Sequence, residues 1–260
     1  MTHYSPGKFV WFEYKTRNPS QGKAFYTDLL PWSTSEMPFP GGTYTMFHAG
    51  ERAVGGVAPL GDDMPNVPEH WLGWVSVEDV DATAAAVTAN GGQVVAGPMD
   101  MGDMMRMAFC LDPEGAAFSI MRSTRGDEPD VDSYAGMFHW NELYADDAAA
   151  AAKFYVAVFG YDLQTMDMAA MGAPGGAYYM LNSGGKPRAG IMAKPMAGIP
   201  SMWLPYVHVD DIDATAKSVT DAGGKLLNKL MTMPGVGRMG MVLDPAGAAI
   251  AFITPNRPAQ

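Results

Sequence analysis

The chain has 260 residues, with 17 Lys and Arg against 28 Asp and Glu, so its formal net charge is −11. Hydrophobic residues make up 48% of the chain and charged residues 17%, which supports a sizeable core and excludes disorder over most of the length. This negative charge repels phosphate backbones, so we expect no nucleic-acid partner. The sequence has neither the roughly 20 apolar residues of a membrane span nor a signal peptide, and it predicts a cytoplasmic protein without a membrane partner.

An internal repeat organises the chain. Phe25-Tyr26 recurs as Phe154-Tyr155, and Asp112-Pro113 recurs as Asp244-Pro245. Without gaps, residues 71–121 match residues 203–253 at 23 of 51 positions. The sequence therefore predicts two copies of one module, over 1–123 and 137–260, and the charged, Gly- and Pro-containing segment 124–136 is typical of an exposed linker.

In chain order, the first module begins with an apolar strand over 9–14 and a helix over 19–30 with a proline near its start. Strands near 44–47 and 53–58 follow, and the pattern then repeats. The second half contains a strand over 72–77, a helix over 80–89 closed by a glycine pair, and strands near 94, 106–111 and 116–121. The order βαβββ thus occurs twice in each module, giving four such units and an α+β fold.

Three local features add to this prediction. Asp112-Pro-Glu-Gly115 and Asp244-Pro-Ala-Gly247 are typical of type I turns at hairpin tips. The single cysteine, Cys110, lies in an apolar run and is expected to be buried. Arg106 and Arg238 occupy equivalent positions, where we expect a salt bridge between the modules; a bidentate contact with a carboxylate ligand is the alternative.

The chain resembles the vicinal oxygen chelate proteins, also called the glyoxalase/bleomycin-resistance/dioxygenase superfamily. The resemblance rests on both Phe-Tyr pairs, both Asp-Pro-X-Gly turns, the glycine pairs and the segments 74–81 and 206–213. It covers nearly the whole chain and is closest to two-module bacterial proteins of the mycobacterial 27 kDa antigen type, labelled glyoxalase-like or hydroxylases. It implies tandem βαβββ modules that form two open β-cups.

Metal-dependent members of that superfamily place His, Gln or Glu ligands at four inward strand positions. On this chain the resemblance puts those positions at Trp11 and Trp140, at Leu72 and Leu204, at Ser119 and Ala251, and within 55–57 and 190–192. Zn, Fe and Mn sites need imidazole, carboxylate or thiolate donors, which these positions lack. We therefore expect no metal and no cofactor.

Starting from the inward positions that the resemblance implies, strand alternation assigns further side chains to the two cups. The inward residues expected to contact a ligand are Trp11, Glu13, Leu72, Trp74, Ser76 and Ser119 in the first module, and Trp140, Leu204 and Tyr206 in the second. The two tryptophans in ligand positions offer stacking faces, although plugging the cup is the alternative. The chain also has 22 methionines, whose adaptable thioethers suit either an apolar pocket or a gap-filling core.

The leading hypothesis is a glyoxalase- or bleomycin-resistance-like protein that binds a small, partly apolar organic ligand without a metal. The alternative is an enzyme of the same superfamily, a lyase, isomerase or oxygenase/hydroxylase-like protein, in which Glu142 and His208 serve as acid and base. A buried hydrogen bond is the structural alternative for those two residues, and His139 is expected to face away from the cup. Because the modules should pack on each other through an apolar interface, a monomer is sufficient.

Overall fold

The computed structural model describes residues 2–39, 42–171 and 176–256. The first module contains β1 (Phe9–Thr16), α1 (Pro19–Leu29), β2 (Trp32–Phe39), β3 (Gly42–Ala49), β4 (Arg52–Pro59), β5 (His70–Ser76), α2 (Val80–Ala89), β6 (Gln93–Met101), β7 (Met105–Leu111) and β8 (Ala117–Ser123). The second contains β9 (Phe138–Ala145), α3 (Ala148–Phe159), β10 (Asp162–Asp167), the short helix η1 (Ala169–Met171), β11 (Ala177–Ser183), β12 (Lys186–Ala193), β13 (Met202–His208), α4 (Ile212–Asp221), β14 (Lys225–Leu226), β15 (Met231–Met233), β16 (Gly237–Leu243) and β17 (Ala249–Pro255). The order βαβββ is therefore confirmed.

Each module contributes one sheet. The first sheet has the strand order β2-β3-β4-β1-β5-β8-β7-β6, and the second has the order β10-β11-β12-β9-β13-β17-β16-β14 with β15 paired to β16. Parallel pairs join β1 to β4 and β5 to β8, and the second sheet repeats them as β9 with β12 and β13 with β17. The predicted α+β class with tandem βαβββ modules is confirmed.

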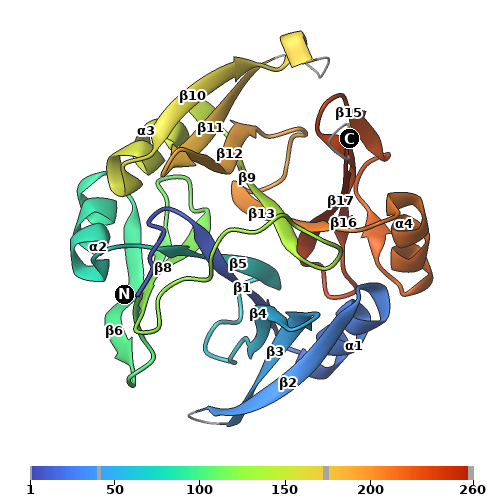
Figure 1. Ribbon diagram of the computed structural model, residues 1–260, viewed down its shortest axis with the longest axis horizontal. Helices are drawn as coiled ribbons and strands as arrows, with labels where there is room; N and C mark the ends of the chain where they lie inside the picture. Colours follow the sequence, from blue (N-terminus) through green and yellow to red (C-terminus); the bar gives the residue numbers. More distant parts are fainter. Residues whose placement is uncertain (1, 40–41, 172–175, 257–260) are drawn as a thin grey trace. The chain divides into compact units, whose positions relative to one another are not determined.

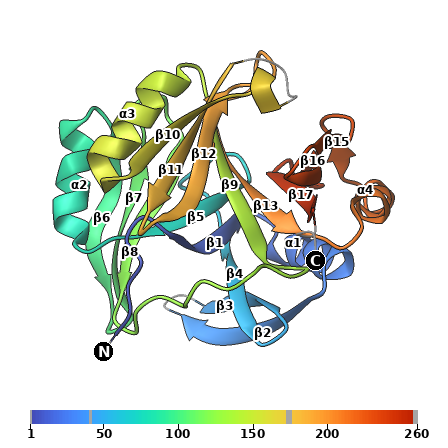
Figure 2. The same ribbon diagram turned by 45° about the horizontal axis from the view of Figure 1, so that its top comes forward.

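The chain divides into two compact units, and each unit takes residues from both modules. Unit 1 comprises the described parts of Met1–Trp11, Leu72–Val131 and Asn141–Trp203, and unit 2 those of Phe12–Trp71, Asp132–Trp140 and Leu204–Gln260. Within unit 1, α2 and α3 lie side by side (Figures 1 and 2). Their apolar faces share one core, in which Phe154 and Tyr155 of α3 contact Phe118 of β8. The expected apolar contact between the modules is thus found inside unit 1.

α2, α3 and α4 begin where the sequence offers a capping carboxylate, and α1 begins after the amide of Asn18. The side chain of Asp79 accepts a hydrogen bond from the backbone N–H of Ala82 at the start of α2, and Asp211 caps α4 in the same way. α3 ends at Gly160, which has a φ of 68°, in the left-handed region that glycine enters without a steric penalty. None of the described helices has the length and apolar composition needed to cross a bilayer.

Both Asp-Pro-X-Gly segments form the expected turns, and each turn is tied to a distant helix. The carboxylate of Asp112, which is buried, accepts hydrogen bonds from two backbone N–H groups of its turn and from the hydroxyl of Tyr155, at 3.2 Å. The indole N–H of Trp203 donates to that same hydroxyl at 2.8 Å. Unit 2 repeats this arrangement with Asp244, Tyr26 and Trp71. The residues that repeat most clearly in the sequence therefore form the same hydrogen-bonded Asp–Tyr–Trp group in each unit. We call this group the lock.

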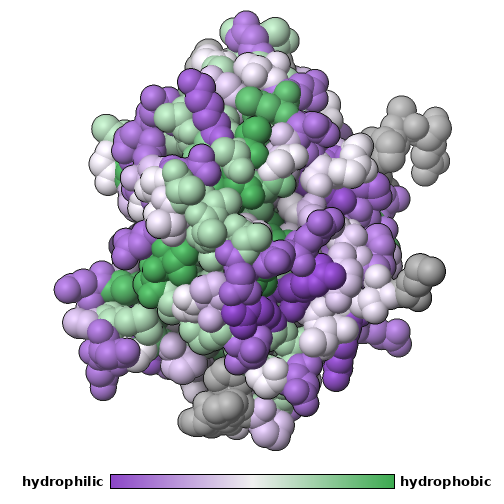
Figure 3. Space-filling model, turned by 90° about the vertical axis from the view of Figure 1, so that its left-hand side faces the viewer, coloured by the Kyte–Doolittle hydropathy of each residue, from purple (hydrophilic) through white to green (hydrophobic). Residues whose placement is uncertain are grey.

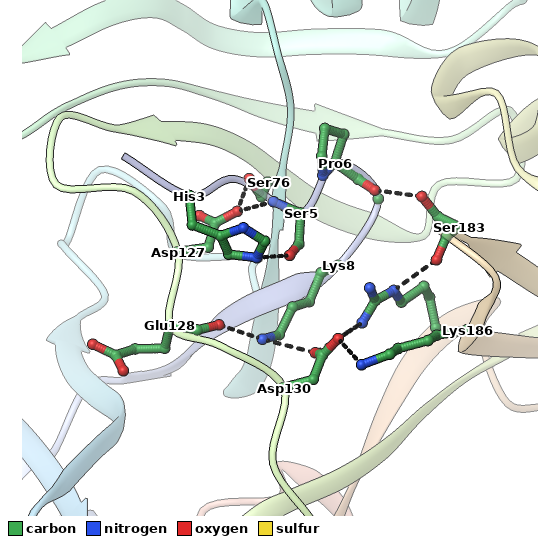
Figure 4. Close-up of polar contacts among 12 residues, drawn as sticks. His3, Ser5, Pro6, Lys8, Ser76, Asp127, Glu128, Asp130, Ser183 and Lys186 are labelled. Carbon is green, nitrogen blue, oxygen red and sulfur yellow. Dashed lines mark hydrogen bonds and ion pairs between the residues drawn. The ribbon is translucent and has the colours of Figure 1, made fainter. Parts of the chain in front are cut away.

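The linker is anchored rather than loose. Asp127 accepts hydrogen bonds from the Ser5 backbone N–H and the Ser76 hydroxyl, and Asp130 forms ion pairs with Lys8, Lys186 and Arg188 at 2.9 to 3.0 Å (Figure 4). Burial by itself raises the pKa of Asp130, but the hydrogen bonds from Arg188, Lys186 and Lys8 outweigh it and hold this pKa well below its usual range.

Two further predictions can be compared with the structure. Cys110 is buried as expected, and burial raises its pKa to about 12, so the thiol is not a reactive group. The expected salt bridge between modules is wrong for both arginines. Arg106 contacts Asp81 and Asp100, and Arg238 contacts Asp213, all within the same module. Both arginines instead reach the first turn of the helix that precedes them, where an acidic residue favours the helix dipole.

Candidate functional site

In unit 1 an apolar cluster forms around Trp74 of β5. Trp74, Met107 and Met121 are buried, and several partly buried side chains pack against them: Val10, Trp11, Met101, Met105 and Phe109. The Phe109 ring meets the Trp74 ring edge-on, with 5.2 Å between the ring centroids. The structure thus brings together Trp11, Trp74 and part of the methionine-rich hairpin β6–β7. Other apolar side chains of that hairpin are exposed, namely Val95, Met99 and Met104.

Two polar atoms lie at this cluster without a partner. Ser119 of β8 stands directly opposite both Trp74 of β5 and Phe109 of β7 in the sheet register, so the three side chains share one face. Ser119 is 0% exposed and Trp74 is 4% exposed. Within the described residues, neither the Ser119 Oγ nor the Trp74 Nε1 has a hydrogen-bond partner. Buried polar groups are normally paired, so each such atom calls for an explanation.

The remaining predicted cup residues of the first module have structural contacts. Leu72 is buried, and the hydroxyl of Ser76 donates to Asp127 at 2.6 Å. In unit 2, Glu13 accepts a hydrogen bond from the Tyr44 hydroxyl at 3.1 Å and pairs with Lys15 at 2.5 Å. Ser76 therefore contacts Asp127 of the linker, and Glu13 contacts Lys15. Both were predicted from the sequence to contact a ligand.

A glutamate–tyrosine pair recurs in both modules. The hydroxyl of Tyr178 donates to Glu142 at 2.9 Å, as that of Tyr44 does to Glu13, and the two glutamates are 8% and 7% exposed. Each tyrosine hydroxyl covers a glycine of the neighbouring strand, Gly190 or Gly56, so closely that an added Cβ would overlap it. The sequence analysis missed both tyrosines. The signal was present, because Tyr44 and Gly56 recur at one common offset.

In unit 2 the hydroxyl of Ser133 lies between two imidazoles. Its Oγ is 2.6 Å from His139 Nδ1 and 3.0 Å from His208 Nδ1, and the two rings are 5.9 Å apart. Since a hydroxyl has one proton, only one of the two nitrogens can accept from it while both rings are neutral. Burial, followed by the charge of His208, lowers the pKa of His139. His139 therefore lies beside His208, and its expected orientation away from the cup stays a prediction.

The other predicted residues of the second module are distributed over both units. Leu204 and Tyr206 are buried on β13 in unit 2, where Tyr206 is in register with Ala251 of β17, and Trp140 is partly buried on β9. Glu142 belongs to unit 1 and His208 to unit 2. Their pairing as acid and base stays a prediction.

The side chains at the superfamily's metal positions do not fit a metal. Trp11, Leu72 and Ser119 in the first module, and Trp140, Leu204 and Ala251 in the second, supply a single hydroxyl and no imidazole or carboxylate. In the part of the chain that the structure describes, no group of three or more His, Cys, Asp or Glu side chains is placed to hold a metal ion. We derive no chemistry through a metal.

Fold and repeat together define a two-module protein of the vicinal oxygen chelate type. Residues 8–120 and 137–252 match the glyoxalase/bleomycin resistance protein/dioxygenase superfamily, and the chain belongs to that superfamily. It is 36% identical over 257 residues to "Putative glyoxylase CFP32" of Mycobacterium tuberculosis, covering 98% of this chain and 97% of that protein. It is 31% identical over 267 residues to the "Anthracycline biosynthesis protein DnrV" of Streptomyces peucetius, covering 97% and 95%.

A solved structure supports the same fold. The Mn(II)-bound glyoxalase from Novosphingobium aromaticivorans superposes with a TM-score of 0.60 at 16% sequence identity, and the match covers 98% of this chain and 83% of that one. At this identity the likeness shows the fold alone. Its metal is a property of that protein, and the positions in this chain differ as described above.

Proposed function

We propose that this chain binds a small, partly apolar organic molecule at the Trp74 cluster of unit 1, without a metal. The observation that carries the proposal is the composition of this cluster, which combines three aromatic rings with four thioethers. Thioether side chains adapt to irregular apolar ligands, and aromatic rings offer large contact areas.

Two further facts support this proposal. Ser119 and Trp11 stand at superfamily metal positions. The face that would hold a metal in a metal-dependent relative therefore carries the apolar side chains of the Trp74 cluster in this chain. The names of two relatives place them in anthracycline biosynthesis, which is chemistry on a small organic molecule. Such a ligand needs no metal for its affinity, because burial of apolar area supplies it.

The test compares two equivalent tryptophans. Trp11→Ala removes a ring from the cluster, and Trp140→Ala removes its counterpart in the second module as a matched control. In a screen of uncharged aromatic compounds, hits should raise the melting temperature of the wild type and of Trp140→Ala, but not that of Trp11→Ala. Met105→Gln, at a partly buried position, provides a second variant in case Trp11→Ala is unstable. A wild-type protein that no compound stabilises would contradict the proposal.

The metal-independent part of the proposal has its own measurement. Elemental analysis of the purified, dialysed protein should show no stoichiometric Zn, Fe, Mn or Ni, because the donors at the four superfamily positions are missing. One metal ion per chain that survives dialysis would show that another set of side chains holds it, and metal-free binding would then be wrong.

A second candidate is acid–base catalysis on a bound metabolite. The observation in its favour is Glu142, a buried carboxylate with a tyrosine hydroxyl at 2.9 Å, in a module that also carries His208. Carboxylates and imidazoles are the side chains that most often serve as general acids and bases. His208→Ala separates the candidates: lost turnover with unchanged binding supports the enzyme, whereas a wild-type protein that turns over no bound compound supports the binding protein.

A further inference from the structure

We propose that the Trp74 cluster recognises an uncharged oxygen acceptor, such as a ketone or quinone carbonyl on a flat aromatic ring system, through the Trp74 Nε1–H and the Ser119 hydroxyl. This inference rests on the proposed function and names the class of ligand for the same site. Its basis is the pair of buried polar atoms that have no partner in the described residues.

The comparison between the modules shows that packing alone does not require Ser119. The equivalent residue of the second module is Ala251, which is also completely buried on the corresponding strand. The residue equivalent to Trp74 in the second module is Tyr206, which has no indole N–H. Since alanine fills the equivalent position in β17, the hydroxyl at Ser119 and its burial without a partner need another cause. A ligand atom that completes the hydrogen bonds is such a cause.

The chemistry of the two groups selects an acceptor. An indole Nε1–H only donates, whereas a serine hydroxyl can donate one hydrogen bond and also accept. Trp74 and Ser119 lie opposite each other on neighbouring strands, so their side chains stand on the same face of the sheet. An acceptor is the one kind of ligand atom that can pair with either group, and a carbonyl oxygen has two lone pairs for them. A hydrocarbon would leave both of them unpaired.

The surroundings select against charge and in favour of a flat ring. The apolar side chains of the cluster include the rings of Trp11, Trp74 and Phe109 and the sulfurs of Met105 and Met107. An ionised carboxylate buried among them would lose its hydration, which is very unfavourable. Aromatic faces and thioethers favour an aromatic ring system instead.

The experiment uses three probes that share one tricyclic ring: fluorenone, fluorene and fluorene-9-carboxylate. Isothermal titration of the full-length protein should show fluorenone binding at least about fivefold more tightly than fluorene, with the carboxylate weakest. Ser119→Ala, which installs the residue of the second module, and Trp74→Phe, which keeps a ring without the N–H, should each reduce the preference for fluorenone severalfold. Each variant should weaken fluorenone binding more than fluorene binding, because fluorene has no oxygen that the lost group could have contacted. Tyr206→Phe is the matched control and should keep the wild-type preference.

The outcomes distinguish the two proposals. If none of the three probes binds, the proposed function fails. If fluorene and fluorenone bind equally, if the carboxylate binds best, or if the variants keep the wild-type preference, the carbonyl inference fails while ligand binding stands. The ligand-free protein gives an independent check: Ser119→Ala should melt at the same temperature as the wild type or higher, because it removes an unpaired buried hydroxyl. A clear drop in melting temperature would show that Ser119 has a partner within the protein, and would overturn the inference.

Discussion

Asp130 shows how much can depend on one carboxylate of a connecting segment. It is the common partner of Lys8, Lys186 and Arg188, of which Arg188 is the most buried, with 9% side-chain exposure. Asp130→Asn should lower the free energy of unfolding by about 1 kcal/mol, because it removes charged hydrogen bonds that water partly screens and leaves the buried Arg188 without this counter-ion. Chemical denaturation measures this effect. Glu128→Gln is the control, since the Glu128 contact shown in Figure 4 uses its backbone carbonyl, and it should change stability by less than about 0.5 kcal/mol.

The same site fixes the sign of a pH effect. Because the pKa of Asp130 is lower in the folded protein than in the unfolded chain, its contribution is present above the unfolded value of about 3.9 and is lost as the pH falls through the folded value. The stability difference between wild type and Asp130→Asn should therefore be largest near neutral pH and shrink in acid. A difference that stays constant down to acidic pH would contradict this assignment.

Single residues also show where sequence reasoning succeeds. Trp11 and Trp74 could be placed on one side because the resemblance implies one inward position in each of their strands, and alternation with a period of two extends it along the strand. The repeat marks Tyr44 and Tyr178 as equivalent positions, but their contacts, like those of Ser133, depend on which residue lies opposite them across a strand pair or a linker. That register is set by the tertiary structure.

At the scale of elements, the strongest sequence signals belong to local geometry. The Asp-Pro-X-Gly turns follow directly from backbone preferences, and the structure confirms them. β2 was passed over because its sequence, Trp32–Phe39, mixes Trp, Met and Phe with Ser, Thr, Glu and Pro without a regular alternation. It is a strand because β3 pairs with it along its whole length, a tertiary effect that overrides weak propensity.

The lock between α3 and the turn after β7 gives a prediction for these elements. Tyr155→Phe removes a hydroxyl that donates to buried Asp112 and accepts from Trp203, so it should cost about 1 to 3 kcal/mol of unfolding free energy. Tyr26→Phe should cost a similar amount through Asp244 and Trp71. Tyr134→Phe, at an exposed tyrosine, is the control and should cost clearly less, because water can replace its lost bond. Equal effects in all three variants would contradict a specific lock.

At the scale of the whole molecule, the module of the sequence differs from the compact unit of the structure. The second half of the first module and the first half of the second make up most of unit 1. The two-module organisation could be predicted because the repeat is visible in the sequence. The composition of each compact unit from parts of both modules could not be predicted. The sequence pattern of one βαβββ unit does not indicate which other unit it packs against.

Cleavage of the linker tests this organisation. A protease site inserted after Val131, which is exposed, would cut the chain between the modules. The two fragments should stay together in size-exclusion chromatography, because the shared core of α2 and α3 and the Tyr155–Asp112 bond join residues of both modules. Two fragments that separate as folded monomers would show that each module is stable without the other.

The tyrosines over Gly56 and Gly190 also restrict how such a protein can evolve. These glycines lie opposite Glu13 and Glu142, in the strands where metal-dependent relatives carry a ligand. A side chain added at either glycine would meet the tyrosine ring and hydroxyl, so the tyrosine would have to move. Moving it takes a hydrogen-bond donor from a buried glutamate. A substitution that adds a possible metal ligand at either glycine therefore also disturbs the carboxylate on the neighbouring strand, which makes this change costly for the fold.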